Sequence, residues 1–147
     1  MENGFKFCTE KIVRKKLLFE VSDRGSGLLL AFYKTERGIL SPTLTNSLIL
    51  TENKDIQFFA GQLLDPSVLD PTGKVELKEP YPYIIRVRWD NMHRIVSFVS
   101  YEDGATVESI RLSPLEAYRV GQLSQNTALI NHLLERLKKY YASVNKE

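Results

Sequence analysis

Residues 112–116, LSPLE, mark the sharpest change of expected structure in this sequence. Ser113 suits the N-cap of a helix, and Pro114 suits the first helical position because its φ angle is already helical. Glu116 completes a capping box with Ser113. The residues just before, 106–112, are rich in β-branched and apolar side chains and predict a strand. We therefore expect the chain to pass from a sheet into a helix at Ser113.

A long amphipathic helix is expected downstream of this segment. Apolar residues recur there at spacings of three and four: Leu129, Ile130, Leu133, Leu134, Leu137 and Tyr141. Nearer the start, Leu115, Tyr118 and Leu123 suit a buried stripe, while the polar cluster at 124–127 predicts a break or kink. We expect the apolar stripe to pack on the chain's own sheet. The alternative is that it pairs across a dimer or lies in a partner's groove.

Two strands are predicted upstream, at 83–89 and 94–101, joined by a turn at 90–93. Alternation gives these strands one apolar face, made by Ile85, Val87, Trp89, Val96 and Phe98. The opposite face is mixed and carries Arg86 and Arg88. One face is therefore expected in the core and the other at the surface.

The first half of the chain gives a weaker copy of this order. Strands are expected at 12–21, 28–34 and 44–50, followed by a short helix that ends at Leu64. Gly-Gln-Leu recurs at 61–63 and 121–123, at similar distances after a strand. A sheet with one apolar face must cover that face with another layer. The sequence therefore predicts an α+β fold of two antiparallel strand-strand-strand(-strand)-helix units packed together, with a long amphipathic C-terminal helix.

A proline-rich linker is predicted between the two units. Residues 66–82 contain four of the six prolines, and proline disfavours both helix in the residue before it and a place in a ladder. We expect a first sheet-and-helix unit at 1–65 and a second at 83–147, forming one compact domain overall.

Composition places the chain among ordinary globular proteins. Hydrophobic residues make up 43% and charged residues 26%, with a net charge of +2. Cys8 is the one cysteine, which excludes an internal disulfide, and its strand-like surroundings predict a buried, inert thiol. No apolar run approaches the ~20 residues of a membrane span. We expect an intracellular protein of the cytoplasm or nucleoid, with the nucleus or an organelle as alternatives.

The repeated strands, followed by a helix entered through Leu112, Ser113, Pro114 and Glu116, resemble the Whirly and Pur-alpha superfamily. That group includes a transcriptional coactivator that binds single-stranded DNA as a dimer. Leu50, Thr51 and Glu52 resemble a degenerate version of the same entry. The lysine-glycine-asparagine motif of plant Whirly proteins is absent from the sequence. The resemblance implies binding of single-stranded nucleic acid by exposed sheet faces, usually in an oligomer, and here we expect a homodimer.

The residues independently permit this use. Single-strand binders combine cationic side chains for the phosphates with aromatic rings for the bases. The candidate nucleic-acid-binding residues are Arg14 and Lys16 on one side of the strand expected at 12–21, Arg86 and Arg88, and the rings of Tyr33 and Tyr101. Alternating charges are also typical of any half-exposed strand, so solvation is the alternative for the basic residues and rim packing for the tyrosines.

No pattern in the sequence indicates catalysis, a metal or a cofactor. His93 and His132 lack cysteines or carboxylates at metal-ligand spacing, apart from a weak pair of His132 with Glu135. The glycines at 25–27 are too few for a phosphate loop, and no nucleophile elbow is present. We expect a non-catalytic protein that binds single-stranded DNA, or alternatively RNA, in replication, recombination, repair or transcription. The alternative is an assembly module that uses the C-terminal helix.

Overall fold

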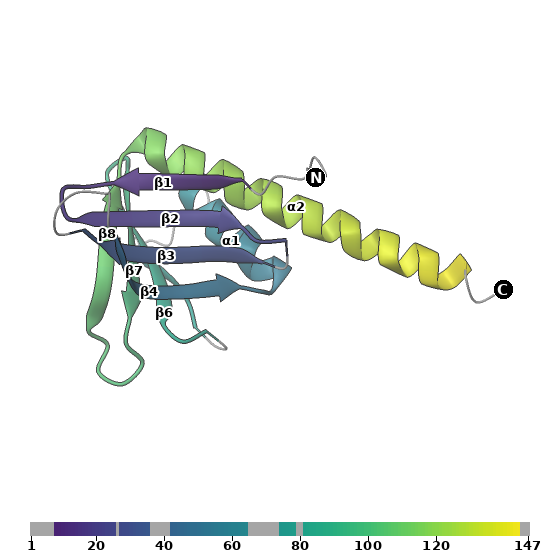
Figure 1. The fold of residues 1–147 in the computed structure, drawn as a ribbon, viewed down its shortest axis with the longest axis horizontal. Coiled ribbons are helices and arrows are strands. Elements are labelled where there is room, and N and C mark those ends of the chain that lie inside the picture. Colours follow the sequence, from purple (N-terminus) through teal and green to yellow (C-terminus); the bar gives the residue numbers. More distant parts are fainter. Residues whose placement is uncertain (1–7, 26, 36–41, 65–73, 79–80, 145–147) are drawn as a thin grey trace.

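A computed structural model describes residues 8–25, 27–35, 42–64, 74–78 and 81–144. The first unit consists of β1 (Thr9–Val13), β2 (Leu17–Asp23), β3 (Leu28–Lys34), β4 (Thr43–Leu50) and α1 (Asn53–Leu64). The second consists of β5 (Lys74–Leu77), β6 (Ile84–Asp90), β7 (His93–Val99), β8 (Thr106–Leu112) and α2 (Pro114–Val144). The fold is α+β, and the predicted repeat of strands followed by a helix is confirmed (Figure 1).

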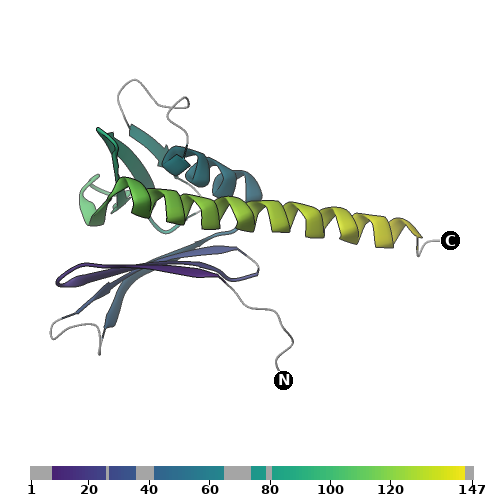
Figure 2. The same ribbon diagram turned by 90° about the horizontal axis from the view of Figure 1, so that it is seen from above.

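Each unit is an antiparallel sheet in which neighbours in sequence are neighbours in space. The strand orders are β1-β2-β3-β4 and β5-β6-β7-β8. Figure 2 shows α2 running between the first sheet on one side and α1 with the second sheet on the other. The first half of α2 therefore contacts both units.

The inner faces of the two sheets meet in one shared core. Phe32 of β3 packs edge-on against Phe98 of β7, with ring centroids 4.9 Å apart, and Phe19 lies 4.8 Å from Phe32. The ring of Tyr83 stacks on that of Phe98, with centroids 5.2 Å apart. The two apolar sheet faces thus meet at this aromatic group, and α1 and α2 cover them elsewhere.

Small residues allow α2 to approach α1 closely. A Cβ built on Gly121 would lie 2.6 Å from the side chain of Leu64, a separation that forces a shift. The face of α2 that packs on the body consists of Ala117, Val120, Gly121, Leu123, Ser124, Thr127 and Ala128. Leu123 is buried as expected, but the expectation for Leu115 and Tyr118 is wrong, because both are exposed.

The predicted break at 124–127 is also wrong, since α2 is continuous from Pro114 to Val144. The hydroxyl of Ser124 donates to the carbonyl of Val120 at 2.8 Å, and that of Thr127 to the carbonyl of Leu123 at 3.0 Å. These hydroxyls bond back to the helix, so they are satisfied inside it and do not end it.

The single strand expected at 12–21 is two strands, and this prediction is wrong. Arg14, Lys15 and Lys16 form the turn between β1 and β2, closed by a bond from the Arg14 amide to the Leu17 carbonyl at 2.8 Å. The turn contains no glycine, proline, asparagine or aspartate, the residues that usually mark one. Arg14 and Lys16 therefore do not share the face of a strand.

Two further expectations need correction. Strand β5 lies within the linker predicted at 66–82 and pairs with β6, whereas residues 65–73 and 79–80 are outside the described part of the chain. Cys8, expected to be buried, is exposed just before β1.

Candidate nucleic-acid interface

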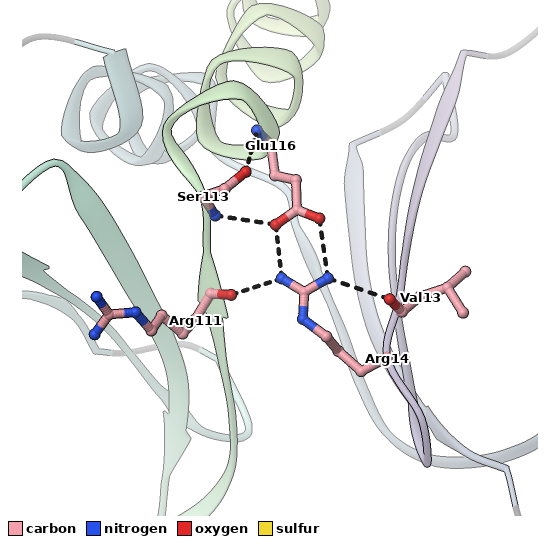
Figure 3. A network of polar contacts seen from close by, with 5 residues as sticks. All are labelled: Val13, Arg14, Arg111, Ser113 and Glu116. Atoms are coloured by element: carbon pink, nitrogen blue, oxygen red, sulfur yellow. Dashed lines mark hydrogen bonds and ion pairs between the residues drawn. The ribbon is translucent and has the colours of Figure 1, made fainter.

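The entry to α2 forms the capping box that the sequence predicts. The Ser113 amide donates to the Glu116 carboxylate at 3.0 Å, and the Glu116 amide donates to the Ser113 hydroxyl at 3.2 Å. Arg14 completes this arrangement from the turn between β1 and β2. Its two terminal nitrogens donate to the two carboxylate oxygens of Glu116 at 2.6 and 2.9 Å (Figure 3). The first sheet is thus bonded to the start of α2.

Arg14 also donates to the main-chain carbonyl of Arg111 at 2.7 Å and to that of Val13 at 3.2 Å (Figure 3). Its side-chain bonds lower the pKa of Glu116 to about 2, and the same bonds raise the pKa of Arg14. The guanidinium therefore has a structural task, which is to join the β1–β2 turn to the end of β8 and to α2. This task occupies both terminal nitrogens of Arg14, which a phosphate would otherwise contact.

A row of residues crosses the outer face of the second sheet near the β6–β7 turn. Arg88 of β6 is the register partner of Ile95 on β7, and Ile95 is the partner of Arg111 on β8. Arg88 is exposed and makes no ion pair with any residue that the structure describes. Arg111 pairs with Asp90, and both side chains are about half exposed.

The next row along the same face contains Arg86. It forms an ion pair with Glu76 of β5 at 3.5 Å, with about one-fifth of each side chain exposed. Arg86 and Arg88 are thus brought to one face, as alternation predicts.

Arg111 was not singled out from the sequence, although a signal for it was present. It lies between Ile110 and Leu112, which are both buried, so alternation along β8 sends Arg111 outward. Because Arg14 bonds to the carbonyl of Arg111, the β1–β2 turn with its exposed Lys15 and Lys16 adjoins this edge of the second sheet. We define the basic surface as the outer-face side chains of Arg86, Arg88 and Arg111, whereas Lys15 and Lys16 lie on the turn that meets the main chain of β8.

The two candidate tyrosines lie apart from each other. Tyr33 is on the outer face of the first sheet, where its hydroxyl donates to the Glu20 carboxylate at 2.8 Å, and this bond raises the pKa of Tyr33. Tyr101 is exposed in the turn after β7. Among the residues named from the sequence, the structure therefore groups the arginines of the second sheet and separates Tyr33 from them.

The second half of α2 projects from the body (Figures 1 and 2). Its large apolar side chains are all exposed by 42–62%: Leu129, Ile130, Leu133, Leu134, Leu137, Tyr140, Tyr141 and Val144. The expectation that this stripe packs on the chain's own sheet is wrong, because the helix extends past the sheets. We define residues 129–144 as the projecting half of α2.

The described residues give no indication of a metal site or a membrane span. They contain no group of three or more His, Cys, Asp or Glu side chains that could hold a metal ion. Across the same residues, no helix is both long enough and apolar enough to traverse a bilayer.

Comparison with known proteins extends the description of the fold. No family model matches the chain, and no curated protein matches it significantly. A crystal structure of MRP1/MRP2 from Trypanosoma brucei is similar to it, with a TM-score of 0.62 at 12% sequence identity. The match covers 86% of this chain and 85% of the other. At this identity the similarity shows a shared fold across nearly the whole chain.

Proposed function

We propose that the protein binds single-stranded nucleic acid, without catalysing a reaction, through the basic surface on its second sheet. The observation that carries the proposal is the row Arg88–Ile95–Arg111, which adjoins the turn bearing Lys15 and Lys16. Such a row places cations on both sides of a half-buried apolar side chain. The phosphates of the nucleic acid would contact the arginines, and the side chain of Ile95 would lie beneath the bound nucleic-acid strand. DNA and RNA both satisfy this chemistry.

The arginines of this surface can bind a phosphate without losing a strong ion pair. Arg88 has no acidic partner in the described part of the chain, and the ion pair of Arg111 with Asp90 is exposed on both sides. An exposed pair contributes only about 0–1 kcal/mol, because water and salt screen it. A phosphate can therefore replace Asp90 at a small cost, whereas the Arg14–Glu116 pair has further hydrogen bonds to lose.

The salt dependence of binding tests this proposal. Each phosphate contact with a single strand adds about −0.7 to the slope of log K against log salt concentration. Replacing both Arg88 and Arg111 with glutamine should reduce the slope by about 1.4 and weaken binding of a labelled oligonucleotide at low salt. The control is Lys11→Gln, an exposed cation on β1 of the first sheet. No binding at low salt, or an equal loss in the control, would contradict the proposal.

A second function, assembly, is favoured by the projecting half of α2. Its apolar residues Ile130, Leu134, Leu137, Tyr141 and Val144 follow spacings of four, three, four and three, as in the seam of a helical bundle. Leu123 and Thr127 extend the same spacing back into the face that packs on the body. The seam is therefore one stripe that is covered in its first half and exposed in its second.

We infer that a second copy of this chain covers the exposed part of the seam. Two identical stripes match each other in a two-fold contact, where each apolar residue meets one from the partner. Two grooves flank α2 where it leaves the body, with volumes of about 470 and 410 Å³. Ile130 lines one groove and Leu129 the other, so the apolar contact can continue onto the body. This enlarges the surface beyond one helix face, as a stable dimer needs.

The assembly proposal is tested by measuring molar mass in solution with light scattering. The natural chain should form a dimer or higher oligomer, and the Leu134→Gln/Leu137→Gln variant should be a monomer with an unchanged circular dichroism spectrum. The matched control is Arg136→Gln/Lys139→Gln, on the polar face of the same turns. A natural chain that stays monomeric at its highest soluble concentration would exclude a second copy as the partner.

A further inference from the structure

Arg94 is a buried cation at the end of the second sheet's inner face. Its guanidinium lies over the ring of Trp89, 3.3 Å from the centroid, and only 5% of the residue is exposed. Its Nε donates to the carbonyl of Gln62 at 3.1 Å. One terminal nitrogen, Nη1, donates to the carbonyls of Met92 at 3.0 Å and His93 at 3.4 Å. All four contacts are to neutral groups.

Part of this arrangement has a structural explanation. The Gln62 carbonyl belongs to the last turn of α1, where carbonyls lack a partner within the helix. Arg94 satisfies one of them and complements the negative end of the helix dipole. This accounts for Nε but leaves the full charge without an anion, because no described carboxylate pairs with Arg94. Burial lowers the pKa of Arg94, and the guanidinium stays protonated at neutral pH.

A pocket opens onto this charge. It has a volume of about 160 Å³ and is lined by Arg94 together with Leu63, Leu64, Met92, Pro114 and Tyr118. One water needs only about 10–15 Å³ of such space, so the pocket can hold a group of several atoms. The other terminal nitrogen of Arg94, Nη2, has no hydrogen-bond partner among the described residues. The lining is otherwise mainly apolar, and a low-polarity wall strengthens attraction between opposite charges.

We propose that this pocket is a binding site for a small oxyanion, a phosphate or carboxylate group, held by the free edge of the Arg94 guanidinium. Arginine suits such groups because its N–H donors match two oxygens of a planar or tetrahedral anion. The site is on the inner side of the second sheet, so it is separate from the basic surface and does not depend on the proposed function.

The protein carries its own reporter for this site. Trp89 is the single tryptophan of the chain, and it contacts Arg94 directly. Titration with inorganic phosphate or acetate, against chloride at equal ionic strength, should change tryptophan fluorescence along a saturating curve. The melting temperature should rise over the same concentration range. Fluorescence that responds to chloride as it does to phosphate and acetate would overturn the proposal.

Removing Arg94 could unfold the end of α1, so the decisive variants change Met92 instead. Met92 lines the pocket and is 60% exposed in the β6–β7 turn, where substitution leaves the core intact. Met92→Glu supplies a tethered carboxylate beside Arg94 and should abolish the response to phosphate, whereas Met92→Gln should keep it. An equal response in both variants would contradict the site. Comparing oligonucleotides with 5′-phosphate and 5′-hydroxyl ends then distinguishes a free anion from the end of a strand.

Discussion

Within α2, the buried residues all lie in 114–128, against both sheets and α1, whereas residues 129–144 leave the body toward the C-terminus (Figure 2). The first half buries small residues such as Ala117, Gly121 and Ala128. The second half exposes large ones, among them Leu133 and Leu137. Both halves are helical, so the difference lies in what each face contacts. Small residues in the first half bring a neighbouring helix close, and large residues in the second half leave apolar area exposed. The number of apolar residues alone therefore does not tell a packed stretch of helix from an exposed one.

The largest difference between the halves should come from the same substitution made in each. Leu123→Ala removes a side chain that is 8% exposed and should cost about 2–4 kcal/mol of folding free energy, through lost burial and a cavity. Leu137→Ala removes one that is 50% exposed and should cost less than about 0.5 kcal/mol in dilute solution. Urea unfolding measures both. Equal losses would show that residue 137 is covered in the folded monomer.

The two glycines of the repeated Gly-Gln-Leu segments give the next test. Gly121→Val places a branched side chain against Leu64 and should cost about 2–3 kcal/mol, by forcing the two helices apart. Gly61→Val at the equivalent position of α1 meets nothing within 4 Å and should be close to neutral. Thermal unfolding of the two variants decides the matter. A tolerated Gly121→Val would mean that α1 and α2 can repack at little cost.

A smaller loss is expected at the start of α2. Glu116→Gln removes the charge that Arg14 binds and weakens the capping box, and should cost about 2 kcal/mol after allowance for the partly exposed pair. The folded pKa of Glu116, about 2, lies below its ordinary value of 4.5. Its stabilisation is therefore fully present above pH 4.5 and is lost as the pH falls toward 2.

This pH dependence is measurable by unfolding the natural chain and Glu116→Gln in parallel across that range. The natural chain should lose stability between pH 4.5 and 2 by more than the variant does, because the variant has no carboxyl to protonate at this position. Parallel curves for the two proteins would show that the pair with Arg14 contributes nothing to folding in solution.

The sequence was informative where the chain changes direction with a clear chemical signal. Ser113, Pro114 and Glu116 predict the start of α2 because capping depends on local hydrogen bonds. Strands β3 and β8 have the predicted bounds because turn residues at 23–27 and 103–104 precede short runs rich in apolar and β-branched side chains. Arg86 and Arg88 share a face because they are two residues apart on one strand.

Other features depend on contacts that local patterns do not encode. The turn at Arg14 is held by hydrogen bonds from its guanidinium to Glu116, which is about a hundred residues away in sequence. The helix continues through Ser124 because its hydroxyl turns back to a carbonyl. The exposure of Leu137 depends on where the sheets end, since the same spacing of apolar residues suits a buried and an exposed stripe. These features require the tertiary arrangement.

The bonds from Arg14 to Glu116 have a mechanical consequence. They fix the base of α2 to both sheets, and the helix has no break along its 31 residues, about 46 Å. Because α2 is held at its start and is unbroken, the direction of its far end is fixed relative to the two sheets. Anything that grips the far end of α2 would therefore hold the two sheets at a set angle and distance. In a pair of copies, the spacing between the two basic surfaces would be determined by helix length, with no flexible joint to average it.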